Sequence, residues 1–261
     1  MCGRYTNDAE LSDIRLAFDV EALELFRDWK PTYNITPSAG PGFEQLFVVQ
    51  TREGKRALRL GRFWMLPQGL SKPLKGVTTF NARAEELAKK PLWRDALAAR
   101  RCLVPATGWR EFRAEGGKKQ PYHFHLGRRL FAFAGLYSTS VDEHGEAVDS
   151  FAIVTTAPSD VAAPFHDRMP LVVEPELYGA WLGTGDDPSR VLEMARAKSL
   201  GLPLEVYASD PIANSGRYEG PRALDAVARE PLPTGPLGGT KKPDPVQGEL
   251  FGAVSPKPRR R

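Results

Sequence analysis

The sequence predicts an α+β protein with a largely antiparallel β-sheet or barrel at its core and helices around it. Segments of strand composition and segments of helical composition follow one another in mixed order, without the regular alternation that a parallel sheet requires. Strand-like segments are densest between residues 102 and 155, in the middle of the chain. With 41% hydrophobic and 10% aromatic residues among 261, the chain can bury a substantial core.

The N-terminal part is expected to contain a helix, a stiff loop and a pair of strands. Asn7 and Glu10 have the spacing of a capping box ahead of apolar residues at helical intervals, which predicts a helix over residues 8–18. Two prolines stiffen residues 31–37, because each disfavours helix in the residue before it. Residues 43–50 and 57–64 have strand composition, and the stretch between them at 52–55 predicts a turn.

The rest of the chain adds the central strands, further helices and a tail. Residues 84–100 have helical composition, with Pro91 as a break or a fresh start. Strands are expected at 102–104, 109–113, 122–126, 130–134, 151–155, 171–174 and 204–208, and helices at 175–182 and 188–198. From about residue 231 the sequence is rich in Pro, Gly and Lys. We therefore expect one domain over 2–230 and a disordered basic tail over 231–261.

Composition restricts the location and the partners of the protein. No window approaches 18 consecutive apolar residues and no signal peptide is recognisable, so we expect no membrane span. Cys2 and Cys102 make no disulfide framework and fit a reducing cytoplasm. The net charge of +4 comes from residues 237–261, which leaves the body neutral, so a DNA-binding surface there requires clustered arginines. We expect a cytoplasmic monomer that needs neither metal nor cofactor.

Cys2 directly follows the initiator methionine, and its small side chain permits methionine removal. The new N-terminal residue would carry an α-amine with a reference pKa of about 7.7–8.0 beside a thiol near 8.5, so both are partly nucleophilic at neutral pH. This pair of groups condenses with aldehydes: the amine forms an imine and the thiol then closes a five-membered thiazolidine ring. The alternative is an incidental cysteine in a disordered terminus.

Three other stretches concentrate residues that could take part in chemistry. NARAE at 81–85 follows a stretch at 78–80 that is predicted to end a strand, and Asn81 there could equally be a helix cap. Glu111 lies in the aromatic stretch GWREF, where burial would raise its pKa and suit it for proton transfer, unless it only pairs with an arginine. His166 and Arg168 lie in a predicted turn, HDRMP, where the histidine could also be structural and the arginine could bind phosphate.

The remaining histidines and the second cysteine are weaker candidates. His123 and His125 alternate with apolar residues and so share one strand face, but no acidic or cysteine cluster accompanies them to form a metal site. We expect that face to be polar and exposed to solvent. Cys102 lies in an apolar strand, where a buried and inert thiol is expected.

Five motifs, in order, resemble the SRAP family of SOS-response-associated peptidase-like, abasic-site-processing proteins. They are MCGRY at 1–5, YNITP at 33–37, NARAE at 81–85, RCLVPATGWREF at 101–112 and HDRMP at 166–170. The resemblance spans roughly residues 2–215, about four fifths of the chain. One short motif would be weak, whereas five in order, with one fixed to the N-terminus, make a strong match.

The resemblance implies that Cys2 cross-links covalently to the ring-opened aldehyde of an abasic site in single-stranded DNA. In the catalytic set, Asn81 would, together with Arg83, position the sugar and phosphate. Glu111 would transfer protons during ring opening and closure, and His166 would assist the formation and collapse of the imine. The implied DNA contacts are Arg4, Asn34, Trp64, Arg83 and Arg168, with Trp64 stacking on a base. An ordinary core tryptophan is the alternative for Trp64.

The chain also departs from the family pattern. Met65 stands where glycine is usual, and a second aromatic residue is missing from 68–70, which puts the stacking surface in doubt. Arg110 and Phe112 replace the usual tyrosine and tryptophan around Glu111. The catalytic set is complete, and the differences fall on the surface that would contact DNA.

The tail contains the peptide QGELF at 247–251, which resembles the Gln-x-x-Leu-Phe motif that docks bacterial replication proteins on the sliding clamp. Gln247, Leu250 and Phe251 would be its anchors. For the body, two other functions stay open beside abasic-site cross-linking. One is an N-terminal-nucleophile hydrolase such as a glutamine amidotransferase, or a thiol autopeptidase, that uses Cys2. The other is a non-covalent reader of modified or single-stranded DNA.

Overall fold

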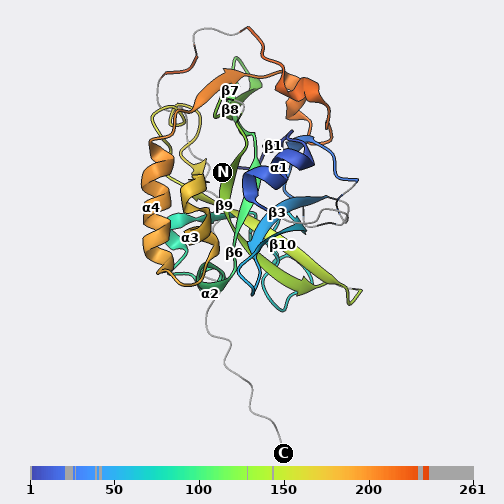
Figure 1. Cartoon of the computed structure of the whole chain (residues 1–261). Helices are drawn as coiled ribbons and strands as arrows, with labels where there is room; N and C mark the ends of the chain where they lie inside the picture. The colour runs from blue at the N-terminus through green and yellow to red at the C-terminus, as the bar shows by residue number, and fades with distance from the viewer. Residues whose placement is uncertain are drawn as a thin grey trace, which may run out of the picture.

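The structure is a computed structural model that describes residues 2–20, 26, 28–38, 40, 43–127, 129–142, 144–228 and 232–234. Figure 1 shows a β-rich body with helices along one side and at its base. The strands are β1 Tyr5–Asn7, β2 Thr32–Ile35, β3 Glu44–Gln50, β4 Arg56–Arg62, β5 Asn81–Arg83, β6 Arg101–Ala106, β7 Gly108–Glu115, β8 Lys118–His125, β9 Phe131–Val141, β10 Ala147–Thr156, β11 Met169–Pro170, β12 Val172–Val173 and β13 Glu205–Ala208. The α-helices are α1 Leu11–Phe18, α2 Pro91–Ala99, α3 Tyr178–Leu182 and α4 Pro188–Leu200, with short 3₁₀ turns η2 Ala84–Glu86, η3 Pro175–Leu177, η4 Pro211–Asn214 and η5 Pro221–Leu224.

Five long strands form a closed ring of pairings, β10–β4–β3–β6–β9 and back to β10. All of these pairings are antiparallel except that of β10 with β4. The three short strands β5, β11 and β12 add to this barrel at β10 and β9. A second sheet, in the order β13-β8-β7-β1-β2, is antiparallel throughout.

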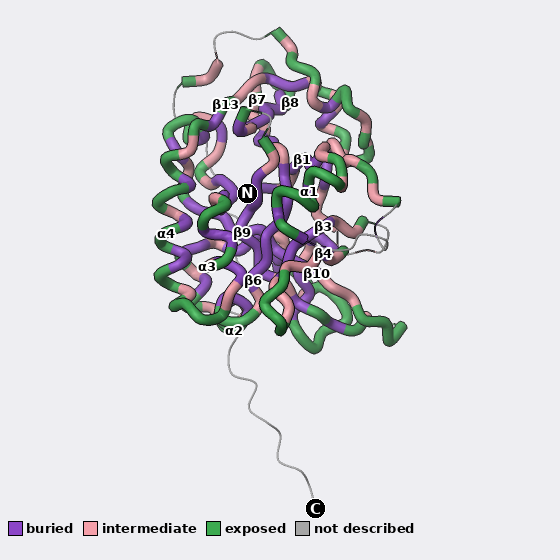
Figure 2. The backbone as a smooth tube through the Cα atoms, in the orientation of Figure 1, coloured by how far each residue is buried: buried purple, intermediate pink, exposed green. Residues whose placement is uncertain are grey.

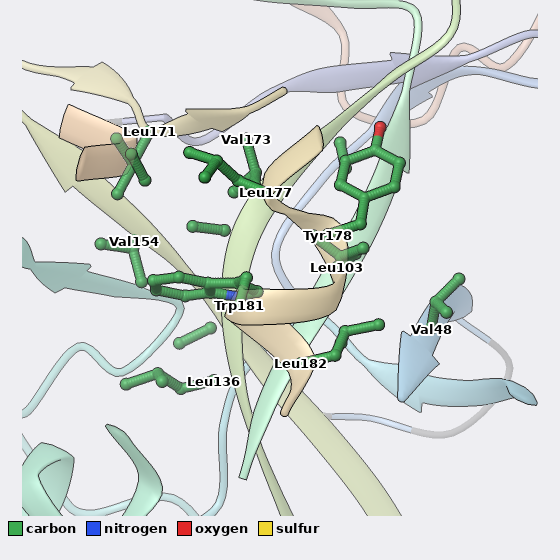
Figure 3. Close-up of a cluster of buried hydrophobic side chains, with 14 of the residues drawn as sticks. Val48, Leu103, Leu136, Val154, Leu171, Val173, Leu177, Tyr178, Trp181 and Leu182 are labelled. Atoms are coloured by element: carbon green, nitrogen blue, oxygen red, sulfur yellow. The ribbon is translucent and has the colours of Figure 1, made fainter. Parts of the chain in front are cut away.

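Alternating residues of the barrel strands feed two hydrophobic clusters. In β10, Phe151 and Ile153 belong to one cluster, while Ala152 and Val154 belong to the other. The first cluster continues to the second sheet through Tyr5 and Trp109, whereas the second lies under the helices. Figure 3 shows the helix-side cluster, with the ring of Trp181 of α3 drawn between Val154 and Leu136, and Leu103 beside Tyr178. The barrel wall is therefore buried on both of its faces, as the β6–β9 region of Figure 2 also shows.

The predicted fold class is confirmed, and so is the break in the segment 84–100, because Pro91 begins α2 at its first turn. The capping box is wrong. Asn7 is the last residue of β1 and α1 begins at Leu11, after Glu10 in the cap position without a side-chain cap. Pairing of β1 with both β2 and β7 draws Asn7 into the sheet. The predicted domain boundary at 230 falls at residues that lie outside the described part of the chain.

The expectation for the His123 face is also wrong. The side chain of His123 is 4% exposed, because β13 and the segment that follows it cover this face of β8. The imidazole lies directly over Gly108, where a Cβ would come within 2.4 Å of it. Burial and the nearby charge of Arg110 hold the pKa of His123 well below its usual value. Glycine at 108 is thus required by this close approach.

Candidate active site

Cys2 lies inside the protein, at one edge of the cluster that joins the barrel to the second sheet. Its side chain is 0% exposed, and Sγ lies 4.0 Å from the carbonyl oxygen of Arg4. The Asn81 side-chain nitrogen donates a hydrogen bond of 3.1 Å to the backbone oxygen of Cys2 and a second one of 2.9 Å to that of Phe80. Asn81 therefore ties the N-terminal segment to the barrel.

Glu111 reaches the same place from the second sheet. Tyr5 pairs with Trp109, and the Arg110 amide donates a 2.9 Å hydrogen bond to the Arg4 carbonyl. This antiparallel register, continued by one residue, sets Gly3 opposite Glu111. The carboxyl group is 4% exposed, and its Oε1 has no hydrogen-bond partner among the described residues.

Electrostatics couple these two groups. Burial is the largest of the effects that together raise the pKa of Glu111 to about 8; the positive N-terminus lowers this pKa and the charge of Asp167 raises it. Burial and the Glu111 charge raise the pKa of the Cys2 thiol far above its usual value. Burial therefore holds the Cys2 thiol as neutral S–H in this state, whereas the sequence alone predicted a thiol that is partly nucleophilic at neutral pH.

Two short strands bring further predicted residues to the end of β10. In β5, Asn81 pairs with Ile153 and Arg83 with Thr155, so both side chains leave the strand on the same face. In β11, Met169 and Pro170 pair with the same end of β10, which places His166 and Arg168 just before it.

The HDRMP stretch forms a compact hydrogen-bonded turn. The His166 Nδ1 accepts a 2.9 Å hydrogen bond from the amide of Arg168 and lies 3.0 Å from an Asp167 carboxylate oxygen. Arg168 directs its Nη2 at a Glu85 carboxylate oxygen, at 2.8 Å, and at the Thr155 carbonyl, at 2.6 Å. The Asp167 carboxylate therefore pairs with His166, and its charge raises the pKa of Glu111.

Arg4 and Asn34 lie on the other side of the N-terminal segment. Asn34 is 0% exposed; its amide nitrogen donates to the carbonyls of Ser215 and Tyr218, and its oxygen accepts from Arg4. Arg4 also donates to the carbonyl of Ala213 at 2.7 Å. That both residues contact DNA stays a prediction, and the geometry shows them holding the 213–218 segment against β1 and β2.

Trp64 is partly exposed and lies two residues after the end of β4. Its ring packs on Phe80 with the ring centroids 5.2 Å apart, next to the β5 strand that carries Asn81. Neighbouring Met65 and Leu66 are fully buried in the body, so Trp64 is anchored at its base. Stacking of Trp64 on a DNA base stays a prediction.

The Arg110 side chain, unlike that of Glu111, leaves the sheet on the outer face. It is buried, donates hydrogen bonds of 2.8 and 2.9 Å to the carbonyls of Tyr33 and Ala223, and has a pKa lowered to about 10 by desolvation. The departure from the family pattern at 110 therefore changes the packing behind the sheet rather than the side that faces Cys2. Phe112 lies under two cations, Arg4 at 5.5 Å and Lys119 at 4.0 Å from its ring centroid.

A cavity of about 670 Å³ opens on that outer face, away from the site. It is lined by Asp8, Tyr33, Thr107, His123, His125, Tyr207, Pro221, Leu224, Asp225 and Ala226. None of the predicted catalytic residues contributes to it. Within the part of the chain that the structure describes, no three His, Cys, Asp or Glu side chains are grouped closely enough to hold a metal ion, and no helix is long and apolar enough to cross a membrane.

Sequence reasoning missed the acidic and basic partners of the predicted arginines. Glu85 belongs to the NARAE motif but has no role predicted from the sequence, and its carboxylate lies between Arg168 and Arg196 of α4. Asp167, which pairs with His166, likewise has no role predicted from the sequence. Their pairings join stretches far apart in the chain, and spacing within the sequence gives no indication of them.

The fold and the site together define a class: a β-barrel protein with a buried cysteine at its N-terminus, set against a buried carboxyl group and an arginine-lined strand end. The family profile described as SOS response associated peptidase (SRAP) matches residues 1–210. The chain belongs to this family, and the resemblance drawn from its motifs is confirmed.

Similar proteins come from several organisms. The chain is 29% identical to YoqW of Bacillus subtilis (strain 168) over 87% of its own length and 100% of that protein. It is 31% identical to YedK of Escherichia coli (strain K12), over 70% of this chain and 79% of that one. Both relatives are named abasic site processing proteins.

Solved structures support the fold. A protein from Bacteroides thetaiotaomicron superposes with a TM-score of 0.71 at 20% identity, covering 87% of this chain and 100% of that one. A phage-related protein from Bordetella bronchiseptica gives a TM-score of 0.59 at 28% identity, with 79% and 93% covered. The first of these likenesses concerns the fold alone.

Proposed function

We propose that this protein processes abasic sites in single-stranded DNA by forming a stable thiazolidine cross-link through Cys2. The observation that carries the proposal is the meeting of Cys2, Asn81 and Glu111, from three distant stretches, in one buried place. Membership of a family whose relatives are named for abasic-site processing supports it.

The proposed reaction begins after methionine removal frees the α-amine of Cys2. The amine adds to the C1′ aldehyde of the opened sugar and, with loss of one water, gives an imine. The thiol then adds to the imine carbon, which forms the C–S bond and returns the proton to nitrogen. An imine left open invites β-elimination of the 3′ phosphate; ring closure removes that electron sink and leaves the strand intact.

Glu111 is suited to both proton transfers of this sequence. With a pKa of about 8, a large share of its carboxyl group is protonated near neutral pH and can donate to the sugar ring oxygen as the ring opens. The resulting carboxylate can then accept the proton of the neutral Cys2 thiol as sulfur attacks and pass it to the imine nitrogen, which becomes the ring N–H. His166, held by Asp167 and the Arg168 amide, would serve the loss of water from the imine precursor.

The DNA contacts follow from the same arrangement. Arg83 and Arg168 flank Thr155 at the end of β10, where they would bind the phosphates beside the lesion. Trp64, anchored on Phe80, would stack on a neighbouring base. Arg4 and Asn34 would support this surface by fixing the N-terminal segment. A protein acting in this way would work as a monomer in the cytoplasm, at the nucleoid.

The proposal is tested by mixing the purified protein with single-stranded DNA that carries one abasic site, followed by denaturing electrophoresis and intact mass spectrometry. We expect a heat-stable adduct whose mass is that of protein plus DNA less one water. A protein with a few extra residues before Cys2 has no α-amine there and should give none. An equal adduct yield from the extended protein would falsify the mechanism.

We also propose that the QGELF peptide docks the protein on a sliding clamp. Gln247, Leu250 and Phe251 lie outside the described residues, so this rests on the sequence alone. Deletion of residues 247–251 should abolish co-purification with the clamp and leave cross-linking unchanged. A matched deletion of 237–241 should affect neither, and equal clamp binding by both deletion proteins would dispose of the idea.

A further inference from the structure

An ion-pair cluster that spans three elements lies beside the proposed DNA contacts. The carboxylate of Glu85, in η2, pairs with two arginines. Its Oε2 lies 2.8 Å from Nη2 of Arg168, and its Oε1 lies 3.2 Å from Nη2 of Arg196 in α4. The two arginines are 28 positions apart in the sequence and share this carboxylate. Two fixed guanidinium groups therefore converge on the oxygens of a single small anion.

Hydrogen bonds to the end of β10 hold both arginines in place. Arg168 donates to the Thr155 carbonyl at 2.6 Å, and the Arg196 Nε donates to the Thr156 hydroxyl at 3.3 Å. Their side chains are 15% and 26% exposed, against 38% for Glu85. The neighbouring residues Thr155 and Thr156 of β10 thus orient both forks toward one position.

Two guanidinium groups share the Glu85 carboxylate, and two further acidic residues, Glu193 and Asp167, lie near the cluster. Glu193, the other acidic partner of Arg196, is three residues before it in α4 and 67% exposed, so solvent screens that pair. The Asp167 carboxylate pairs with His166. A pair of oriented guanidinium groups that share one partly exposed carboxylate is the arrangement that binds a phosphate when the carboxylate moves aside.

We propose that Arg196 is a DNA-phosphate contact and that Glu85 occupies its phosphate position, paired with Arg168, until the strand binds. The inference rests on the proposed function, because Arg168 is itself one of the proposed phosphate contacts. It extends the path of the strand from the end of β10 onto α4, which no motif indicated. It also assigns opposite effects to the two members of the pair: loss of Arg196 weakens binding, whereas loss of the Glu85 charge strengthens it.

The test measures non-covalent binding to single-stranded DNA without an abasic site, as a function of salt concentration. For Arg196→Ala we expect the slope of log affinity against log salt to fall by about 0.7, the value for one phosphate contact on a single strand. Glu85→Gln is expected to bind roughly two- to fivefold more tightly at low salt. The matched control Arg190→Ala removes the same charge from an exposed position of the same helix and should leave the slope near that of the wild type.

Each outcome decides the question. An Arg196→Ala slope equal to that of the wild type, with only a lower melting temperature, means that the cluster is a structural ion pair and overturns the inference. Tighter binding by Glu85→Gln together with a smaller slope for Arg196→Ala supports it. Cross-link yield on abasic DNA is read in parallel: if the wild type binds DNA with these slopes but forms no adduct, the proposed function fails while the phosphate site stands.

Discussion

Replacing Cys2 by serine is expected to reduce the yield of heat-stable adduct by at least about a hundredfold, the scale on which loss of a nucleophile is felt. The serine variant keeps its α-amine and can still form the imine. Its hydroxyl is a poorer nucleophile and closes no stable ring, so the electron sink survives. We therefore expect a complex that only borohydride traps, together with strand cleavage by β-elimination on a sequencing gel.

The chain supplies a matched control in its second cysteine. Cys102 is also fully buried, and burial with the charge of Asp149 raises the pKa of its thiol well above the usual value. It lies in β6 of the barrel wall, on the cluster that also contains Cys2. Cys102→Ser should leave adduct yield and strand integrity unchanged. If Cys2→Ser still formed the heat-stable adduct and Cys102→Ser did not, the reacting residue would be Cys102, and the proposal for Cys2 would be wrong.

The long strands were predictable from the sequence and the short ones were not. Residues 44–50, 56–62 and 147–156 carry enough apolar and β-branched side chains to be recognised as strands. β1, β2, β5 and β11 have two to four residues each. In the sequence they fall in a terminus, in a stiff loop, in the polar stretch after a predicted strand end, and beside a predicted turn. They are strands because a neighbouring strand offers free backbone groups, which is a tertiary effect that no local pattern contains.

These same short strands carry the site. β1 follows Cys2 and Arg4, β5 contains Asn81 and Arg83, and β11 follows His166 and Arg168. Sequence reasoning chose these residues by type and by family resemblance, and the structure explains their meeting by the pairing of β5 and β11 with the end of β10. The aromatic strand around Glu111 indicated that its carboxyl group could be buried, and in the structure Glu111 is buried. Burial of the Cys2 thiol was not, because a chain terminus is usually exposed.

Glu111 gives the second large effect, in the pH dependence of the reaction. Glu111→Gln should slow adduct formation by roughly 10²–10⁴-fold, the usual share of a positioned general acid. In the wild type, the first step needs the protonated carboxyl group, so its contribution falls as the pH rises through about 8. The glutamine variant should lose this decline and keep only the rise that belongs to deprotonation of the α-amine. Glu115→Gln, at the far end of the same strand, is the control and should retain the wild-type profile.

The same carboxyl group predicts a stability change of known sign. Its pKa is raised in the folded state, so the folded protein binds the proton more tightly than the unfolded chain. The resulting stabilisation is complete below about pH 4.5 and is lost as the pH rises through about 8, on the order of a few kcal/mol for a fully buried group. Glu111→Gln cannot ionise and should escape this loss. The free energy of unfolding in urea, measured at several pH values, should therefore rise for the variant relative to the wild type between pH 5 and pH 9. If this difference did not change with pH, Glu111 would be solvated, and its proposed proton transfer would lack a physical basis.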